Sequence, residues 1–269
     1  MDIRSSSPET VARPFTALIL DFFFPQRCLH CRKTGRRICR GCADAIPWIG
    51  RRGCPLCGLP SEGGGSHRCV ERGRLQFIRS AAEFSGAMRK ALHALKYSSD
   101  RFLADELIRL AGPHWMLPNW EFDTLVPVPL GRERERTRGY NQSLLLAGAL
   151  SRSMGIPVSA DVLRRVRETQ SQVGLSRVER KQNMEGAFRA APMAGRRILL
   201  VDDVCTTGAT LRSCAAALAE AGAAAVGALT LARAPEPGAG REEIIPSHGG
   251  IHDHPDSRQR IRNGDDPAP

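Results

Sequence analysis

The sequence contains few lysines and no long apolar run. The lack of such a run argues against a protein that spans a membrane. Only four of its 39 Lys and Arg residues are lysines, so arginine carries nearly all of the positive charge. The apolar stretch 15–24 is interrupted by Asp21, is too short to span a bilayer and lacks the small-residue cleavage site of a secretory signal. We therefore expect no transmembrane segment and no export signal, and we expect a soluble cytoplasmic protein.

The same stretch has the periodicity of an amphipathic helix. Its apolar residues at helical spacing are Phe15, Leu18, Ile19, Phe22 and Phe23. Such a helix has two uses, which are docking onto a neighbouring domain and binding a membrane surface. We favour docking.

The charge of the chain is strongly positive and unevenly distributed. The formal net charge is +11, which favours polyanionic partners such as phosphate ligands, nucleic acid or an anionic surface. Residues 1–80 contain 14 Lys and Arg against 6 Asp and Glu, and residues 131–190 contain 12 against 6. The excess therefore lies in a cysteine-rich N-terminal region and in a segment near the middle of the chain.

Two Cys-x-x-Cys pairs open the cysteine-rich region. Cys28 and Cys31 form the first pair, and Cys39 and Cys42 form the second, with seven residues between the pairs. Because we expect no export, metal binding is favoured over disulfides. Four thiolates at this spacing can close a tetrahedral Zn²⁺ site with no open position, so we predict structural zinc. Redox-active or unligated thiols are the alternative.

A second set of candidate ligands follows the first. Its cysteines are Cys54, Cys57 and Cys69, and His67 lies close to the last of them. Three arrangements stay open. His67 completes a Cys₃His site, the second site is weak, or the cysteines of the two sets pair in a crossed order.

Beyond residue 76 the pattern is that of an α/β domain. Strands are predicted near 77–84 and 124–128, and helices near 88–95, 101–110 and 141–153. Pro127 excludes the second of these strands from a central place in the sheet. Positions 198–201 form a continuous apolar run, which is typical of a strand buried on both faces of a parallel sheet.

The segment after this run has the residues of a sugar-phosphate site. Asp202 and Asp203 come at the end of the strand, where open α/β sheets bind ligands. A helix with its stop near Gly222 follows a short loop, whose backbone N–H groups and hydroxyls form an anion cradle. The loop residues are Thr206, Thr207, Gly208, Ala209 and Thr210. Paired carboxylates beside a phosphate cradle suit vicinal ribose hydroxyls or hydrated Mg²⁺.

This segment resembles the signature for phosphoribosyl pyrophosphate (PRPP) of type I phosphoribosyltransferases. Three further motifs resemble those of the ComF/GntX branch, the competence-protein-like homologues of these enzymes. They are Val126-Pro-Val-Pro-Leu130, Arg138-Gly-Tyr-Asn-Gln142, and the stretch from Gln172 to Phe188. The resemblance covers roughly residues 15–233. It implies an α/β type I phosphoribosyltransferase fold, a twisted and mostly parallel sheet flanked by helices, preceded by a small domain like a double zinc ribbon.

The resulting domain organisation has four parts. We expect an amphipathic helix and tail in 1–25, a zinc-binding domain in 26–75, a phosphoribosyltransferase-like domain in 76–233 and a disordered tail in 234–269. In the resembling family a further cysteine lies three residues after the one at Cys69, whereas this chain has Arg72 there. The departure places the second zinc site in doubt.

The resemblance also implies which residues face the pyrophosphate. A loop after strand 124–128 has this role in the family, and here it contains Pro129, Leu130, Arg132 and Arg138. The arginine charge agrees with that role. The long polar segment 164–186 resembles the mobile loop that closes over substrate. Its candidate residues are Arg177, Arg180 and Lys181.

Two functions follow from these features. In the first, the chain is an enzyme that transfers phosphoribosyl from PRPP, with Mg²⁺, to an unidentified acceptor. Alternatively it is a non-catalytic module that binds single-stranded DNA, because ComF-like proteins are associated with the DNA-uptake machinery of natural transformation. No general base and no acceptor-binding motif is evident in the sequence, and the oligomeric state is not indicated.

Overall fold

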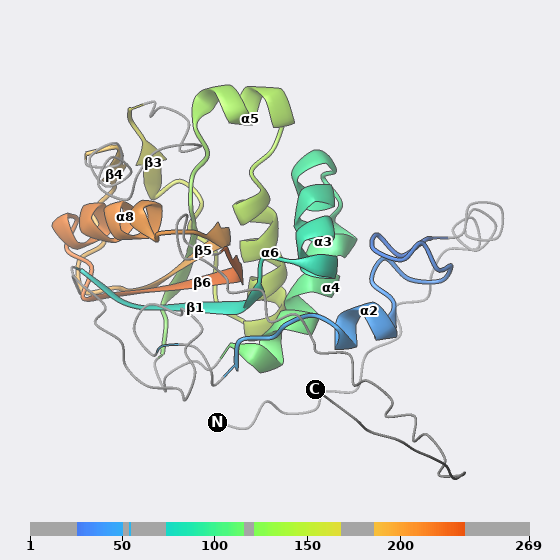
Figure 1. Ribbon diagram of the computed structural model, residues 1–269. Coiled ribbons are helices and arrows are strands. Elements are labelled where there is room, and N and C mark those ends of the chain that lie inside the picture. Colours follow the sequence, from blue (N-terminus) through green and yellow to red (C-terminus); the bar gives the residue numbers. More distant parts are fainter. Residues whose placement is uncertain (1–25, 51–53, 55–73, 116–120, 168–185, 235–269) are drawn as a thin grey trace, which may run out of the picture. The chain divides into compact units, whose positions relative to one another are not determined.

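The computed structural model describes residues 26–50, 54, 74–115, 121–167 and 186–234 (Figure 1). The strands are β1 (Leu75–Glu83), β2 (Thr124–Pro127), β3 (Leu163–Arg165), β4 (Phe188–Ala190), β5 (Arg197–Cys205) and β6 (Ala225–Arg233). The helices are α2 (Arg40–Asp44), α3 (Gly86–Tyr97), α4 (Arg101–Ala111), α5 (Arg132–Arg138), α6 (Gln142–Met154) and α8 (Ala209–Glu220), with a 3₁₀ turn η3 (Gly112–His114).

Four of the strands form one parallel sheet in the order β1-β6-β5-β2. In β5, Ile198 to Val201 are all buried, and β6 is buried over eight of its nine residues. These continuous apolar runs are expected for strands covered on both faces. Pro127 is the last residue of β2, which is the last strand in the order. On its other side, Leu125 of β2 forms a parallel bridge to Val158, so the strand has a further neighbour and the prediction drawn from its proline stays a prediction.

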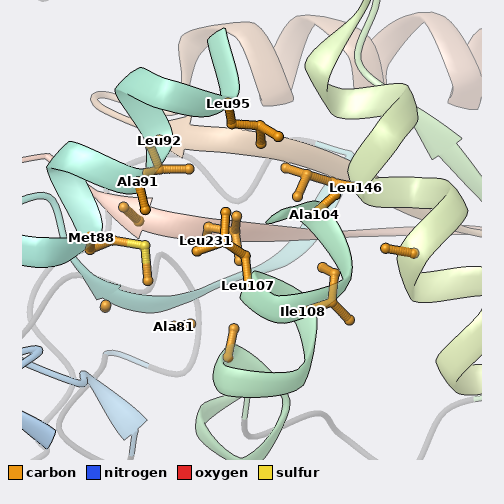
Figure 2. Close-up of a cluster of buried hydrophobic side chains, with 14 of the residues drawn as sticks. Ala81, Met88, Ala91, Leu92, Leu95, Ala104, Leu107, Ile108, Leu146 and Leu231 are labelled. Atoms are coloured by element: carbon orange, nitrogen blue, oxygen red, sulfur yellow. The ribbon is translucent and has the colours of Figure 1, made fainter. Parts of the chain in front are cut away.

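Helices cover both faces of the sheet. On one face α3, α4 and α6 pack against side chains of β5 and β6, and Figure 2 shows Met88, Leu92 and Leu107 in this core beside Leu231 of β6. On the other face α8 and the β3–β4 hairpin cover the alternate residues of β5 and β6. The predicted α/β fold is therefore confirmed, and the carboxyl ends of its strands lie at one edge between the two helical layers.

Helix ends are where the sequence signals placed them. Asp100 caps α4, since its Oδ1 accepts from Phe102 N and Leu103 N at 3.0 and 3.1 Å. Asn141 caps α6 in the same way through Ser143 N at 2.9 Å, and the helix ends before Gly155, whose φ is 72°. These local signals sufficed because a cap needs only its own turn.

The segment after β2 differs from its prediction. We expected a basic loop between residues 131 and 142, but Arg132–Arg138 forms helix α5. Two glutamates lie in its first turn and two arginines in its last, which complements the helix dipole. Gly139 ends the helix in the left-handed conformation, with φ of 74°. The prediction of a loop rested on the number of arginines and did not consider that acidic residues come first and basic residues last in this segment.

The cysteine-rich segment contacts the α/β body through its last described residues. Ile49 N donates to Ala81 O at 2.9 Å and Glu83 N donates to Pro47 O at 3.0 Å, so the segment around Trp48 runs antiparallel along β1. The indole of Trp48 stacks on His114, with ring centroids 4.0 Å apart. Phe77 lies in the core, and Trp48 is packed against it.

Several expectations concern residues outside the described ranges. They are the amphipathic helix in 15–24 and all of the tail 234–269 except Ala234. Among the helices of the described ranges, none combines the length and apolar character that crossing a bilayer requires.

The contact between β1 and β6 generates a test of the packing. A methyl group on Gly227 would overlap the buried ring of Phe77. We expect Gly227→Ala to lower the free energy of unfolding by about 1–3 kcal/mol through overpacking. Gly148→Ala in α6 is the matched control. Its added methyl group makes ordinary contact with Arg152, and the substitution replaces a glycine inside a helix. It should stabilise by about 0.5–1 kcal/mol. Urea denaturation measures both, and equal effects would contradict the packing.

Candidate functional site

A cleft of about 560 Å³ opens at the carboxyl ends of β5 and β2. Its lining brings together the strand-end acids, the loop before α8, and residues of α3, α5 and β3. The predicted site residues among them are Asp202, Asp203, Thr206, Gly208, Ala209, Thr210, Pro129, Leu130 and Arg138. Residues far apart in the sequence therefore form one concave site of the size that small ligands occupy.

The two acidic residues have different neighbours. Asp202 Oδ1 accepts from Ser143 Oγ at 2.8 Å and from Asp203 N at 2.9 Å. Asp203 Oδ1 accepts from Val204 N at 2.9 Å, and Asp203 Oδ2 forms an ion pair with Lys96 Nζ at 3.1 Å. Both residues lie inside β5, paired to β6, rather than after the strand as the sequence suggested. The pair is thereby held on a rigid element.

Burial and like charge act on the protonation of this pair. Burial, together with the charge of Asp203, raises the pKa of Asp202 to about 7. The hydrogen bond from Ser143, the N–H of Asp203 and the charge of Lys96 oppose this rise. Near neutral pH the free protein therefore holds Asp202 only partly ionised, and a cation or hydrogen-bond donor in the cleft would favour the carboxylate.

The loop before α8 forms the anion cradle. Gly208 has φ of 75° and is the N-cap of α8, so the backbone turns sharply where the helix begins. Thr206 and Thr210 line the cleft. Thr207 does not line it: this residue is buried, its Oγ1 accepts from Ala209 N at 3.3 Å, and its carbonyl accepts from Arg212 Nη2 at 2.6 Å. Thr207 thus braces the loop, whose other residues face the cleft.

Four cations surround the acidic pair. Lys96, Arg134, Arg138 and Arg165 line the cleft, so the site has a net charge of +2 when both carboxylates are ionised. Arg132 is exposed on α5 and is not part of the lining. Arg177, Arg180 and Lys181 lie outside the described residues, as does most of the segment 164–186. The balance of charge suits a ligand with several negative charges.

The Arg138-Gly-Tyr-Asn-Gln142 motif joins the cleft to its surroundings. Arg138 Nη1 donates to Gln142 Oε1 at 2.9 Å, Tyr140 OH donates to Leu95 O at 2.6 Å, and Asn141 Nδ2 donates to Val128 O at 3.0 Å. Burial raises the pKa of the Tyr140 hydroxyl. The motif therefore fixes the α5–α6 junction against α3 and β2, which places Arg138 at the cleft.

Sequence reasoning missed three residues of the site. They are Lys96, Ser143 and Arg165. Lys96 and Ser143 carry no local signal, because their roles arise only when α3 and α6 pack beside β5.

The first four cysteines converge into a second candidate site. The sulfur atoms of Cys28, Cys31, Cys39 and Cys42 all lie within 4.8 Å of one another, and Cys31 Sγ is 3.5 Å from Cys39 Sγ. Thiolates around tetrahedral Zn²⁺ lie about 3.8 Å apart, given Zn–S bonds of about 2.3 Å. The cluster therefore fits zinc, and the two Cys-x-x-Cys pairs share one site rather than pairing in a crossed order.

The second set of cysteines is described only in part. Cys54 is buried, whereas Cys57, His67 and Cys69 lie outside the described residues. The question of their ligation stays a prediction.

Comparisons with known proteins agree with both sites. Residues 141–245 match the model of the phosphoribosyl transferase domain, and residues 19–71 match that of the double zinc ribbon domain. Competence protein F of Haemophilus influenzae is 34% identical over 236 residues, which cover 79% of this chain and 99% of the relative. The chain belongs to the competence protein F family.

Two further relatives support this assignment. Competence protein ComFC of Bacillus subtilis is 32% identical over 80% of this chain and 94% of its own length. The DNA utilization protein YhgH of Escherichia coli K12 is 36% identical over 67% of this chain and 83% of its own length. The predicted combination of a zinc ribbon with a phosphoribosyltransferase domain is thus confirmed, while the domain boundaries stay predictions.

The cysteine cluster predicts how zinc depends on a single ligand. Cys42→Ser removes one of four thiolates, so we expect the zinc content to fall by about one ion per chain. Cys214→Ala is the control, because Cys214 is buried in α8 and belongs to no cysteine cluster among the described residues. Mass spectrometry of the purified proteins measures the metal. Equal zinc content in the Cys42 variant and the wild type would contradict the assignment.

Because the pKa of Asp202 is raised, we expect its replacement by a neutral residue to stabilise the protein, and to do so increasingly as the pH rises. Between about pH 4 and 7 the folded state retains a proton that the unfolded state releases, so the free energy of unfolding falls as pH rises through this window. Asp202→Asn abolishes this loss. It should stabilise the protein by about 4 kcal/mol at pH 8 and by almost nothing at pH 4.

Thermal denaturation at the two pH values measures the effect on Asp202. The exposed Asp161 supplies the control, since Asp161→Asn should show no such growth with pH. A constant or negative effect of Asp202→Asn across the range would contradict the raised pKa.

Proposed function

We propose that the chain binds PRPP in the cleft and transfers its phosphoribosyl group to an acceptor. The observation that carries this proposal is the meeting of an anion cradle, two carboxylates and four cations in one cleft. The cradle at the start of α8 suits the 5-phosphate. Asp202 and Asp203 suit the ribose hydroxyls, and the cations suit the pyrophosphate.

The residues present also fit magnesium. Asp202 Oδ2 accepts no hydrogen bond from the described residues, and a carboxylate oxygen is a ligand that Mg²⁺ prefers, directly or through its water shell. Asp202 would hold the ion, which would supply positive charge for departing pyrophosphate when bound. This fit supports Mg²⁺ as the companion of PRPP.

The chain's own residues would act through charge and position. Displacement at C1 of the ribose develops positive charge on the sugar, as in glycoside chemistry. The carboxylates would orient the ribose and stabilise that charge, while Arg134 and Arg138 would stabilise the leaving pyrophosphate. No histidine lines the described part of the cleft, and we assign no general base. The attacking atom belongs to the acceptor and would bond to C1 as the bond between C1 and pyrophosphate breaks.

A second candidate function is binding of single-stranded DNA. Five basic residues are exposed around the zinc cluster: Arg27, Arg32, Lys33, Arg36 and Arg40. Tyr97 and Phe102 are 73% and 74% exposed, and Arg37 lies 6.0 Å from the ring centroid of Phe102. Exposed rings beside basic side chains suit stacked bases and a phosphate backbone. The names of the relatives, which refer to competence and DNA utilization, agree with this candidate.

Calorimetric titration of PRPP with Mg²⁺ tests the first function. We expect the wild type to bind and the Asp202→Asn/Asp203→Asn variant to bind at least about 100-fold more weakly, because two charge-assisted contacts are lost. Asp161→Asn should bind as the wild type does. Omission of Mg²⁺ should weaken binding as well.

The same preparations separate the two candidates. No PRPP binding by a folded, zinc-loaded wild type would refute the transferase. Binding of labelled single-stranded DNA that falls steeply with salt, survives the double substitution and weakens on Arg32→Ala or Arg36→Ala would then support the DNA module.

A further inference from the structure

Lys96 occupies the boundary between the core and the cleft. It lies in the last turn of α3, one turn beyond Leu92, whose side chain is fully buried against the sheet. Its ammonium group lines the cleft and is 3.1 Å from Asp203 Oδ2, with its side chain 27% exposed. The buried face of α3 thus ends in a cation directed at the acidic pair.

Both partners of this ion pair are held in place. The carbonyl of Leu95, the residue before Lys96, accepts from Tyr140 OH at 2.6 Å, which ties the end of α3 to the α5–α6 junction. Asp203 is 6% exposed and its Oδ1 accepts from Val204 N. Little freedom remains for the carboxylate to turn, since one oxygen faces its own backbone and the other faces Lys96.

Stability alone is a poor explanation for the pair. Burying two charges costs desolvation that their attraction often fails to recover, and apolar residues of similar size usually serve a core as well or better. A lysine pointing into a ligand cleft, paired with an acid of that cleft, is better explained by the ligand. Asp203 Oδ2 is buried and has no hydrogen-bond partner among the described residues, although Lys96 Nζ lies 3.1 Å away, and a buried polar atom in this state calls for a functional explanation.

We propose that Lys96 is the positioning residue of the acidic pair. It fixes the orientation of the Asp203 carboxylate beside the place where the cleft would hold the ribose. This inference rests on the proposed binding of PRPP. Three other cations face the same cleft, Arg134 and Arg138 from α5 and Arg165 from β3. Lys96 is singled out because its ammonium group forms an ion pair with Asp203 at 3.1 Å.

Titration of PRPP with Mg²⁺ into Lys96 variants tests the proposal. Lys96→Met keeps the length of the side chain and removes its charge, and we expect about a 10-fold or larger rise in Kd. Lys96→Arg restores a cation and should recover most of the affinity. Lys90→Met is the matched control, because Lys90 is exposed on the same helix. It should bind as the wild type does.

A double-mutant cycle shows whether Lys96 acts through Asp203. If it does, Lys96→Met should add little to the Kd of Asp203→Asn, so that the double variant binds as the Asp203 variant does. A further 10-fold loss would show that Lys96 contacts the ligand itself, and would overturn the positioning role. Should Lys96→Met fail to fold, the double variant, which removes the Asp203 carboxylate together with its cation, carries the same comparison.

Two remaining outcomes separate this inference from the function beneath it. Wild-type affinity in a folded Lys96→Met variant would overturn the role of Lys96 and leave the PRPP site intact. Absence of binding by the wild type, with its zinc present, would refute the proposed function and this inference with it.

Discussion

The structure depends on one electrostatic constraint, which is the placement of two adjacent carboxylates at the end of a buried parallel strand. Burial, together with the charge of Asp203, raises the pKa of Asp202 to about 7 and disfavours its ionisation. The surroundings supply compensation from separate elements: Lys96 from α3, Ser143 from α6 and backbone N–H groups of β5. The packing of these helices on the sheet is therefore also what makes the acids usable.

This arrangement costs stability where it prepares function. A core of Leu and Ala side chains from α3, α4 and α6 lies directly beneath the acids and contributes the burial that offsets the cost. Functional sites that hold ionised groups in a poorly solvated place commonly lower the stability of the protein. In the protein without ligand, contacts from the protein itself stabilise the two carboxylates. A ligand that brings hydroxyl donors and cations would stabilise their ionised forms further.

Much of the fold followed from local patterns in the sequence, because strand burial, helix caps and terminal glycines act within one or two turns. The helices predicted near 101–110 and 141–153 are such cases, since the structure has them at Arg101–Ala111 and Gln142–Met154. Helix α5 was missed although Glu133, Glu135, Arg136 and Arg138 carry its signal. Lys96 could not have been assigned, because its partner lies on a strand more than a hundred residues later and only the topology brings α3 beside β5. Thr207 was named as a cradle hydroxyl, yet the structure buries this residue while Thr206 and Thr210 line the cleft, a difference that no spacing reveals.

The zinc ribbon and the cleft share a structural support. Arg37, between Cys31 and Cys39, forms an ion pair with Asp100 at 2.7 Å, and Asp100 also caps α4. Asp100 follows α3 by three residues, and α3 carries Lys96 near its end. Because metal ligation contributes directly to the folding of such small domains, we expect zinc loss to weaken the ion pair between Arg37 and Asp100. A loss of PRPP binding in a zinc-depleted protein would therefore not distinguish a DNA-binding ribbon from a supporting one. Substitution of the exposed Arg32 or Arg36 makes that distinction, because it leaves the Arg37–Asp100 ion pair in place.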